Sequence, residues 1–385
     1  MREFLNQKAL SLRQGAIRAM FDRALGREGV INLGIGEPDA PTHPDIIRAA
    51  SEALEGGLTH YTPNAGFLDL RQAIADSPGI AAAGYDPGTE IIVTMGGMGA
   101  LSNLMSVLLE PGDEVLVPDP VWLNYQTQIS YANGLPVFVP SVFEQKFAMQ
   151  PEEILKRVTP QTKAIILNNP SNPTGCLLSE EQLAGIAGIA CEYDLLVISD
   201  EVYNTLVYDG KKALSIATLP GMKERTVTVN SFSKSYAMTG WRIGYAAGPR
   251  RIIEKMVLLQ ENYVACVSSA SQAAARYALS RNDIALGICE EYEQRRNLIY
   301  QGLSEIPGMH CMKPEGAFYI FPDIRALPLD ADQFCERLLD EAGVVCIPGE
   351  AFGASGKGCI RISYSDSVEN LIEAIRRIKG FVATL

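Results

Sequence analysis

Short apolar runs recur along the chain from about residue 90 onward, and segments of helical length separate them. Most runs are continuous rather than alternating, which is typical of strands buried on both faces of a sheet. The expected strands lie at residues 90–95, 114–118, 136–140, 163–167, 195–199, 226–230 and 242–246. Helices between them are expected at residues 99–109, 179–193 and 210–217. This alternation predicts an α/β fold with a mostly parallel sheet covered by helices.

The last hundred residues follow a different pattern. A long, charged, periodic helix is expected at residues 284–303, and the short apolar runs after it are separated by expected helices at residues 331–342 and 367–381. This mixture predicts a smaller α+β unit. A helix at about residues 11–25 can pack against that unit.

The length of the chain suggests more than one domain. Hydrophobic cores stop growing at roughly 250–300 residues, and this chain has 385. We expect a large α/β domain at residues 30–282. The small α+β domain is expected to combine residues 1–29 with residues 283–385.

The composition excludes several classes of function. Hydrophobic residues make up 47% of the chain and charged residues 20%, as in ordinary globular proteins. The formal net charge is −12 and no basic stripe is visible, which argues against nucleic-acid binding. Eight scattered cysteines and three widely separated histidines predict free thiols and no metal site. Without a signal peptide or a membrane-spanning run, the protein is expected to be cytoplasmic.

A lysine motif follows the expected strand TVTVN. It reads SFSKSYAMTGWRIGY, from Ser231 to Tyr245. Ligands of open α/β sheets bind at the C-terminal ends of strands. Lys234, among small and aromatic residues, is expected to be partly desolvated there, which lowers the pKa of an amine and frees it to form an imine. Taken alone, Lys234 is more simply explained as an exposed loop lysine.

Three further polar motifs also follow expected strands. SDEVY places Asp200 where a carboxylate can keep the ring nitrogen of pyridoxal phosphate protonated. NNPSNPTG forms a stiff turn that holds the amide of Asn172. MGGMGAL opens into a helix whose N-terminus suits an anion. Each motif alone is more simply a cap or a turn, but four of them on one sheet point to a common site.

The combination of NPTG, SDEVY, SxSK and MTGWRIGY resembles the class I/II aminotransferases of pyridoxal-phosphate fold type I. The resemblance runs from INLGIGEPD at Ile31 to RISYS at Arg361, and is strongest to bacterial and archaeal aspartate and aromatic aminotransferases. It implies pyridoxal 5′-phosphate as cofactor and a homodimer. It also implies ping-pong transfer of an amino group from an L-amino acid, aromatic or acidic, to a 2-oxo acid such as 2-oxoglutarate.

The resemblance also implies the roles of individual residues. The catalytic residues would be Lys234, which forms the Schiff base and shuttles the proton, Asp200 and Tyr203. The cofactor would be bound by Gly97, Met98, Gly99, Trp122, Asn172, Asp200, Tyr203, Ser231, Lys234, Arg242 and Tyr61 from the neighbouring subunit. The substrate would be bound by Gly36, Asn172 and Arg361. Met98 departs from the family pattern, because a serine or threonine often contacts the phosphate at this position.

Other functions remain open at this point. The same residues serve pyridoxal-phosphate C–S β-lyases, because a fold does not determine a reaction. A cofactor-binding transcription regulator needs a DNA-binding module, for which the roughly 30 residues before INLGIGEPD are too few. The amino donor also stays open, and includes an N-acetylated diamino acid.

Overall fold

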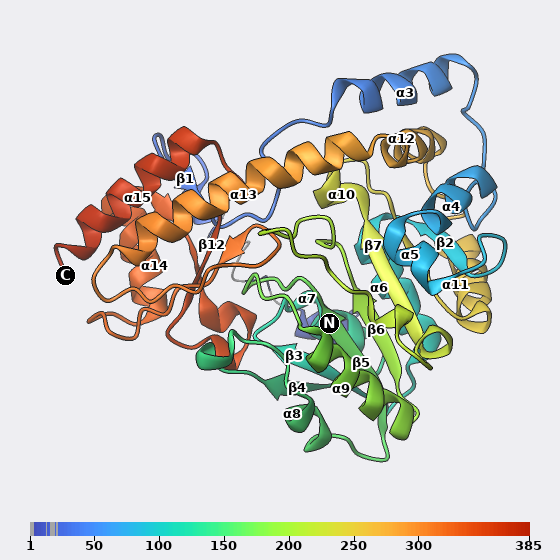
Figure 1. The fold of residues 1–385 in the computed structure, drawn as a ribbon, viewed down its shortest axis with the longest axis horizontal. Helices are drawn as coiled ribbons and strands as arrows, with labels where there is room; N and C mark the ends of the chain where they lie inside the picture. The colour runs from blue at the N-terminus through green and yellow to red at the C-terminus, as the bar shows by residue number, and fades with distance from the viewer. Residues whose placement is uncertain (1–3, 13, 16–19, 21) are drawn as a thin grey trace.

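A seven-stranded sheet forms the centre of the computed structural model, which describes residues 4–12, 14–15, 20 and 22–385 (Figure 1). Its strands are β2 (Ile91–Thr94), β3 (Glu114–Asp119), β4 (Leu135–Pro140), β5 (Thr162–Asn168), β6 (Leu196–Asp200), β7 (Thr226–Ser231) and β8 (Gly244–Ala247). Their spatial order is β2-β8-β7-β6-β5-β3-β4. Only β8 runs antiparallel to its neighbours in this sheet. The expected α/β fold with a mostly parallel sheet is confirmed.

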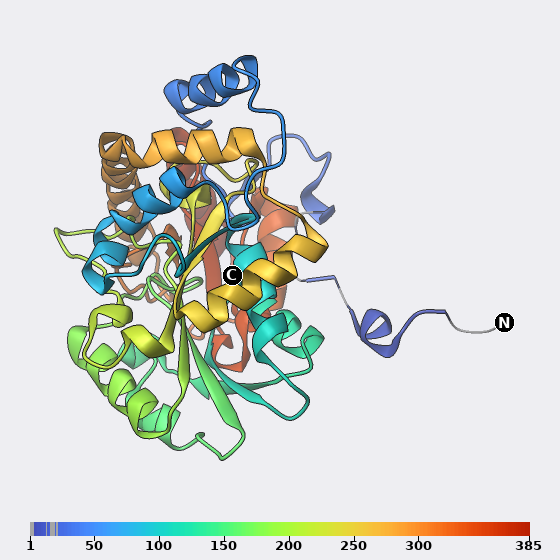
Figure 2. The same ribbon diagram turned by 90° about the vertical axis from the view of Figure 1, so that its right-hand side faces the viewer.

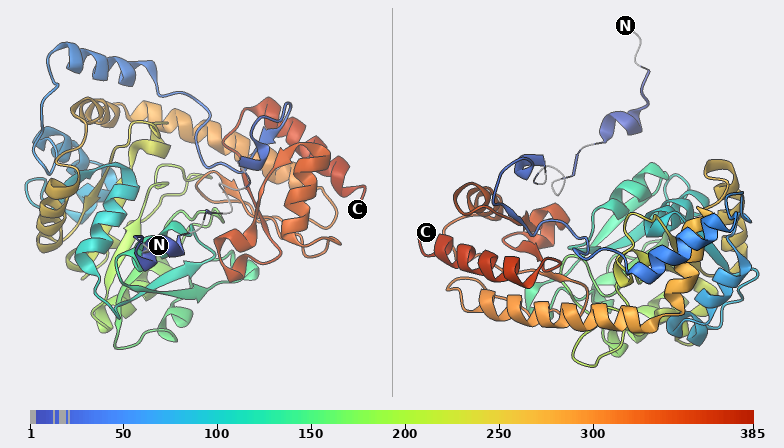
Figure 3. Two further views of the ribbon diagram at one scale, coloured as in Figure 1. Left: turned by 180° about the vertical axis from the view of Figure 1, so that it is seen from behind. Right: turned by 90° about the horizontal axis from the view of Figure 1, so that it is seen from above.

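Helices cover both faces of this sheet, because its strands carry apolar side chains to both sides. In β2, Ile92 packs on one side, and Ile91 and Val93 pack on the other. The first face is covered by α6 (Gly96–Leu108), α7 (Asn124–Tyr131) and α11 (Arg250–Tyr263). The second face is covered by α4 (Leu68–Ala75), α5 (Pro78–Ala83), α9 (Glu180–Glu192) and α12 (Ser269–Leu279). The continuous apolar runs of the sequence thus correspond to strands between two helical layers (Figure 3).

Local signals explain where several helices begin and end. The hydroxyl of Ser179 accepts from the backbone N–H of Gln182, whose side chain accepts from the backbone N–H of Ser179, and this reciprocal pair starts α9. Asp330 caps the N-terminus of α14 (Ala331–Ala342). Gly343, with a φ of 66°, ends the same helix in the left-handed conformation that glycine adopts without strain.

The C-terminal part contains two small sheets. β9 (Tyr319–Ile320), β11 (Ile347–Pro348) and β12 (Ile360–Ser363) pair antiparallel in the order β11-β12-β9. β1 (Ile31–Asn32) pairs parallel with β10 (Val344–Val345). The long helix α13 (Asn282–Ser304) runs from α12 to α15 (Val368–Val382), as Figure 1 shows. The domain boundaries near residues 30 and 282 stay a prediction.

Two expectations about elements differ from the structure. Residues 210–217 are not helical and contain only the start of the short 3₁₀ helix Ile216–Thr218. Gly210 has a φ of 68°, and the segment carries the Ser215 hydroxyl to Glu201, with which it makes a 2.6 Å hydrogen bond. The strand expected from residue 242 begins at Gly244, because Arg242 has a left-handed φ of 52°.

The N-terminal segment lies at the edge of the molecule. Of the helix expected at residues 11–25, residues 13, 16–19 and 21 lie outside those described; residues 12, 14 and 15 are not helical, whereas residues 20 and 22–24 are. Before it, α1 (Gln7–Ser11) stands at the periphery in Figure 2, and Lys8 donates to the backbone carbonyl of Tyr131 at 2.6 Å. In the part of the chain that is described, no helix combines the length and the apolar character needed to cross a lipid bilayer.

Candidate active site

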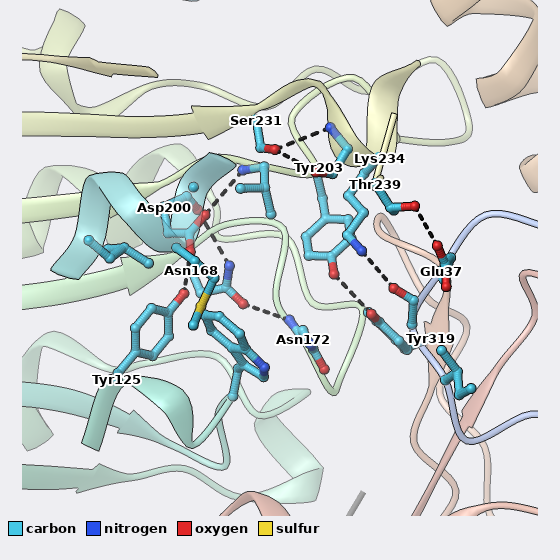
Figure 4. A pocket seen from close by; sticks show the side chains of 18 of the residues that line it. Glu37, Tyr125, Asn168, Asn172, Asp200, Tyr203, Ser231, Lys234, Thr239 and Tyr319 are labelled. Carbon is cyan, nitrogen blue, oxygen red and sulfur yellow. Dashed lines mark hydrogen bonds between the residues drawn. The ribbon is translucent and has the colours of Figure 1, made fainter. Parts of the chain in front are cut away.

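A cavity of about 360 Å³ lies where β5, β6 and β7 end (Figure 4). The three strands finish at Asn168, Asp200 and Ser231, and all three residues line the cavity. Most of the predicted site residues line it as well: Gly36, Gly97, Met98, Trp122, Asn172, Asp200, Tyr203, Ser231, Lys234, Arg242 and Arg361. Segments from both ends of the chain therefore meet at one edge of the sheet, as expected for open α/β folds.

Lys234 projects into this cavity from the short helix α10 (Phe232–Ser235) that directly follows β7. Its Nζ donates to the carbonyl oxygen of Gly36 at 2.6 Å. Burial lowers the pKa of Lys234 to about 8, against the opposing effect of the Glu37 carboxylate, while Arg361 adds a lowering effect. Roughly a tenth of this amine is therefore unprotonated at pH 7, far more than for an exposed lysine, and is able to act as a nucleophile or a base.

Asp200 lies at the end of β6 on the sheet face covered by α6 and α7. The hydroxyl of Tyr125 in α7 donates to its Oδ2 at 2.5 Å, and the N–H of Val202 donates to its Oδ1 at 3.3 Å. Burial raises the pKa of Asp200 to about 6, and these two hydrogen bonds oppose that rise. A buried carboxylate of this kind favours a cationic partner inside the cavity. Trp122 stands edge-on to Tyr125, with 5.3 Å between ring centroids.

Arg361 is the most enclosed cation of the cavity, with 2% of its surface exposed. It comes from β12 and lies between the rings of Tyr319 and Phe352, with 4.7 Å from its Cζ to each ring centroid. Its Nη1 donates to Oδ1 of Asn172 at 3.1 Å, and its Nη2 donates to the carbonyl of Gly34. Its Nε is buried without a partner among the described residues. A carboxylate matches the planar fork of guanidinium.

Two tyrosine hydroxyls meet beside this arginine. The Oη atoms of Tyr203 and Tyr319 are 2.9 Å apart. A Cβ atom added at Gly36 would overlap the hydroxyl of Tyr319, so only glycine fits where this backbone meets the ring. Asn172 is held in turn, because its backbone N–H donates to Oδ1 of Asn168 at 2.7 Å.

The opposite end of the cavity suits an anion. The N-terminus of α6 begins at Gly96, and the first N–H groups of a helix have no acceptor within the helix. Ser231 and Arg242 line the same end, and a Cβ added at Gly96 would lie 2.7 Å from Nη2 of Arg242. Helix N-termini attract phosphate groups. The backbone N–H groups of Gly97 and Met98 are therefore free to bind one.

The structure does not bring two of the predicted residues to the cavity. The N–H of Gly99 donates to the carbonyl of Met95 at 3.3 Å, because the fourth residue of α6 is the first to find an acceptor one turn back. Tyr61 is 89% exposed and lies outside the cavity of its own chain. Its predicted role concerns a neighbouring subunit.

Sequence reasoning missed several residues that line the cavity. Tyr125 lies three positions after Trp122 in VWLNY, and Tyr319 lies in GAFYIFP. Glu37 receives a hydrogen bond from the hydroxyl of Thr239 at the mouth of the cavity. The short separation from Trp122, just before α7, was a usable signal for Tyr125. Thr239 lies in the motif MTGWRIGY but was given no role there, and no local pattern marks Tyr319, because its partners are distant in sequence.

Comparison with known proteins identifies the family to which the chain belongs. Residues 28–378 match the family described as aminotransferase class I and II. The chain is 46% identical over 371 residues to the aromatic-amino-acid aminotransferase 2 of Thermococcus litoralis, covering 94% of each chain. It is equally similar, with the same coverage, to an aspartate aminotransferase of Pyrococcus abyssi. The crystal structure of an aromatic aminotransferase from Pyrococcus horikoshii has a TM-score of 0.89 at 45% identity, over 95% of this chain and 99% of the other.

These similarities extend over nearly the whole chain, so they describe the complete fold and not one motif. The resemblance inferred from NPTG, SDEVY, SxSK and MTGWRIGY is confirmed, and the β-lyase alternative is not favoured. The chain belongs to the class I and II aminotransferases.

Proposed function

We propose that the cavity binds pyridoxal 5′-phosphate and that the chain uses it to move an amino group from an L-amino acid to a 2-oxo acid. The observation that carries the proposal is the position of the Lys234 amine. It lies in one cavity with the buried carboxylate of Asp200 and the anion-binding N-terminus of α6. These are the three kinds of group that the aldehyde, the ring nitrogen and the phosphate of this cofactor require.

The residues present fit this cofactor. Ser231, Arg242 and the backbone N–H groups of Gly97 and Met98 would hold its phosphate. The side chains of Trp122, Asn172 and Tyr203 would contact its ring. The buried Asp200, held by Tyr125, would face the ring nitrogen. When bound, the cofactor supplies a carbonyl that exchanges between amines and a ring that accepts electrons from the substrate Cα.

Individual side chains supply proton transfer, charge stabilisation and substrate binding. Lys234 Nζ, with a pKa of about 8, takes and returns a proton at the substrate Cα. Asp200 Oδ2, oriented by the hydroxyl of Tyr125, would stabilise positive charge on the ring. Arg361, which lines the cavity, would bind the α-carboxylate of the substrate through its planar fork of donors. Gly36 and Asn172 lie beside that arginine and complete the carboxylate site.

We propose an aromatic or acidic L-amino acid as donor and 2-oxoglutarate as acceptor. The names of the relatives support this choice, since one acts on aromatic amino acids and another on aspartate. A panel of donors with 2-oxoglutarate as acceptor tests it, with formation of glutamate as the readout. We expect the highest kcat/KM for tyrosine, phenylalanine or aspartate. A panel in which an N-acetylated diamino acid is preferred would refute this choice.

We also propose a homodimer in which Tyr61 of the partner subunit contacts the phosphate. The support is its exposure, because a tyrosine that is 89% exposed in one chain is available to a second. Tyr263 is a second exposed tyrosine, at 79%. It lies three residues before Cys266, whose Sγ accepts a hydrogen bond from the backbone N–H of Thr62, the residue after Tyr61.

Replacement of the lysine tests the central proposal. Wild-type protein mixed with pyridoxal phosphate should develop visible absorbance, and Lys234→Ala should lose this band along with at least a thousandfold in kcat. The control is Lys212→Ala, an exposed lysine in the loop after Gly210 that lines no part of this cavity. Retention of both the absorbance band and the turnover in Lys234→Ala would contradict the proposed role of Lys234.

A further inference from the structure

Beside the cavity, an arginine of α13 holds the loop that carries Gly36. Nη1 of Arg295 donates to Oδ1 of Asp39 at 2.6 Å, and its Nη2 donates to Oδ2 at 3.1 Å. The side chain of Arg295 is only 5% exposed, whereas that of Asp39 is 29% exposed. A two-pronged contact of this kind determines orientation as well as distance. Neither residue lines the cavity, so the pair has no part in the site as described above.

The loop is also held on its other side. The hydroxyl of Thr239, within the lysine motif, donates to the carboxylate of Glu37. One residue before Glu37, the carbonyl of Gly36 accepts from Lys234 Nζ. Gly36, Glu37 and Asp39 are therefore contacted by side chains from α10, from the segment after it and from α13.

The next residue of α13 holds the facing wall of the cavity. Arg296 is fully buried and donates to both carboxylate oxygens of Asp209 at 2.9 Å, and to the carbonyl of Pro314 at 2.7 Å. Pro314 precedes the segment that ends at Tyr319, whose hydroxyl touches Gly36. Two consecutive arginines of one helix thus hold the two segments that meet at the substrate end of the cavity.

We propose that Asp39 and Arg295 are positioning residues for the transamination reaction: their ion pair keeps the Gly36 backbone at the distance from Lys234 and Arg361 that substrate binding requires. This inference rests on the proposed function, because it assigns the pair to the carboxylate end of the same cavity. The geometry separates it from a purely structural role. The pair anchors a loop three residues from the contact with Lys234, and that loop also contributes Glu37 to the mouth of the cavity.

Asp39→Asn tests the proposal, since it keeps the shape of the side chain and removes its charge. We expect KM for the amino donor to rise about tenfold, while kcat and the cofactor dissociation constant stay within twofold of wild type. Hydrogen exchange of the amides at residues 35–40, measured without substrate, should become at least tenfold faster. Combining this change with Arg295→Lys should add little to the rise in KM, because either change alone breaks the two-pronged contact.

Glu291→Gln is the matched control. Glu291 also accepts from Nη2 of Arg295, but it lies on α13 itself and does not touch the loop. We expect wild-type KM and wild-type exchange for this variant. The proposal is overturned if Glu291→Gln raises KM as much as Asp39→Asn does. It is also overturned if Asp39→Asn leaves KM unchanged, or lowers Tm, kcat and cofactor affinity together. Failure of the proposed function is distinguishable, because the wild-type protein would then lack transaminase activity.

Discussion

Asp200 and Glu201 are neighbours in sequence, yet they face opposite sides of the sheet because successive side chains of a strand alternate. Asp200 meets Tyr125 and the cavity, whereas Glu201 meets the hydroxyls of Ser199 and Ser215 at 2.9 and 2.6 Å. Each carboxyl group is buried and accepts hydrogen bonds, so burial raises its pKa and the hydrogen bonds oppose that rise. At the scale of single residues, we therefore expect changes around Asp200 to affect catalysis and changes at Glu201 to affect stability.

Loss of the Tyr125 hydroxyl should weaken catalysis most at low pH. Tyr125→Phe removes a donor to a carboxylate, a bond worth roughly 1.5–3 kcal/mol, so the pKa of Asp200 should rise further above its value of about 6. We expect kcat/KM to fall at least tenfold at pH 7 and less at pH 9, where Asp200 is ionised again. The pH profile of kcat/KM is the measurement.

Tyr131→Phe is the control for this change, since Tyr131 is an exposed tyrosine in the same helix α7. It should leave the profile as in wild type. A loss in Tyr125→Phe that is equal at both pH values would contradict the proposed effect on Asp200.

Glu201 should make the protein less stable as pH rises. Burial raises the pKa of Glu201 from 4.5 to about 7. Between these values the folded chain binds more protons than the unfolded chain, so the free energy of unfolding falls with rising pH. Glu201→Gln lacks this loss. Its stability relative to wild type should therefore increase from pH 5 to pH 8, by at most about 3 kcal/mol.

Urea unfolding at the two pH values measures this difference. Glu192→Gln, which removes an exposed carboxylate at the end of α9, is the control. Parallel pH profiles of Glu201→Gln and wild type would show that Glu201 carries no such linkage.

At the scale of elements, much of the sheet could be predicted from the chain. A continuous apolar run identifies a strand buried on both faces, and β2, β3, β5, β6 and β7 correspond to such runs, whereas β4 forms the partly exposed edge. Residues 210–217 could not be predicted in this way, because their shape depends on the distant contact between Ser215 and Glu201. The positions of Lys234 and Asp200 at strand ends were predictable for the same reason as the strands. The contact of Tyr319 with Tyr203 and that of Asp39 with Arg295 could not be predicted, because in each case the partner lies far along the chain.

The antiparallel strand β8 is pressed against the N-terminus of α6. A Cβ added at Gly244 would lie 2.7 Å from the carbonyl oxygen of Asn230, 2.7 Å from the carbonyl carbon of Gly96 and 2.8 Å from the nitrogen of Gly97. All three atoms belong to backbone, so none can move aside cheaply. Gly244→Ala should therefore cost about 1–3 kcal/mol of stability and weaken pyridoxal-phosphate binding, as measured by thermal unfolding and by absorbance titration.

Gly188→Ala is the matched control, because Gly188 lies in the exposed part of α9 with open space around it. This change should stabilise the protein by about 0.5–1 kcal/mol through helix propensity. A Gly244→Ala variant with wild-type Tm and cofactor affinity would mean that β8 and α6 separate easily.

At the scale of the whole molecule, the proposed dimer makes the site depend on two chains. Tyr61→Phe would remove a donor from the phosphate of the partner subunit's site. We expect the cofactor dissociation constant to rise about tenfold, as for loss of one hydrogen bond to a charged group, with kcat unchanged at saturating cofactor. Absorbance titration of cofactor-free protein measures this constant.

Tyr193→Phe, at an exposed position outside the cavity, should leave the constant unchanged. Wild-type cofactor affinity in Tyr61→Phe would argue that Tyr61 has no part in the neighbouring site.

The contact between Arg361 and the carbonyl of Gly34 has a consequence for how the protein is made. The two residues are 327 positions apart. Ribosomes add about 5–20 residues per second, so Gly34 waits roughly 15 seconds to a minute before its partner is synthesised. Until then, the part of the cavity that binds the substrate carboxylate is incomplete, and a nascent chain cannot bind an amino acid there. Newborn copies should thus remain catalytically silent until Arg361 has emerged, whatever the supply of cofactor.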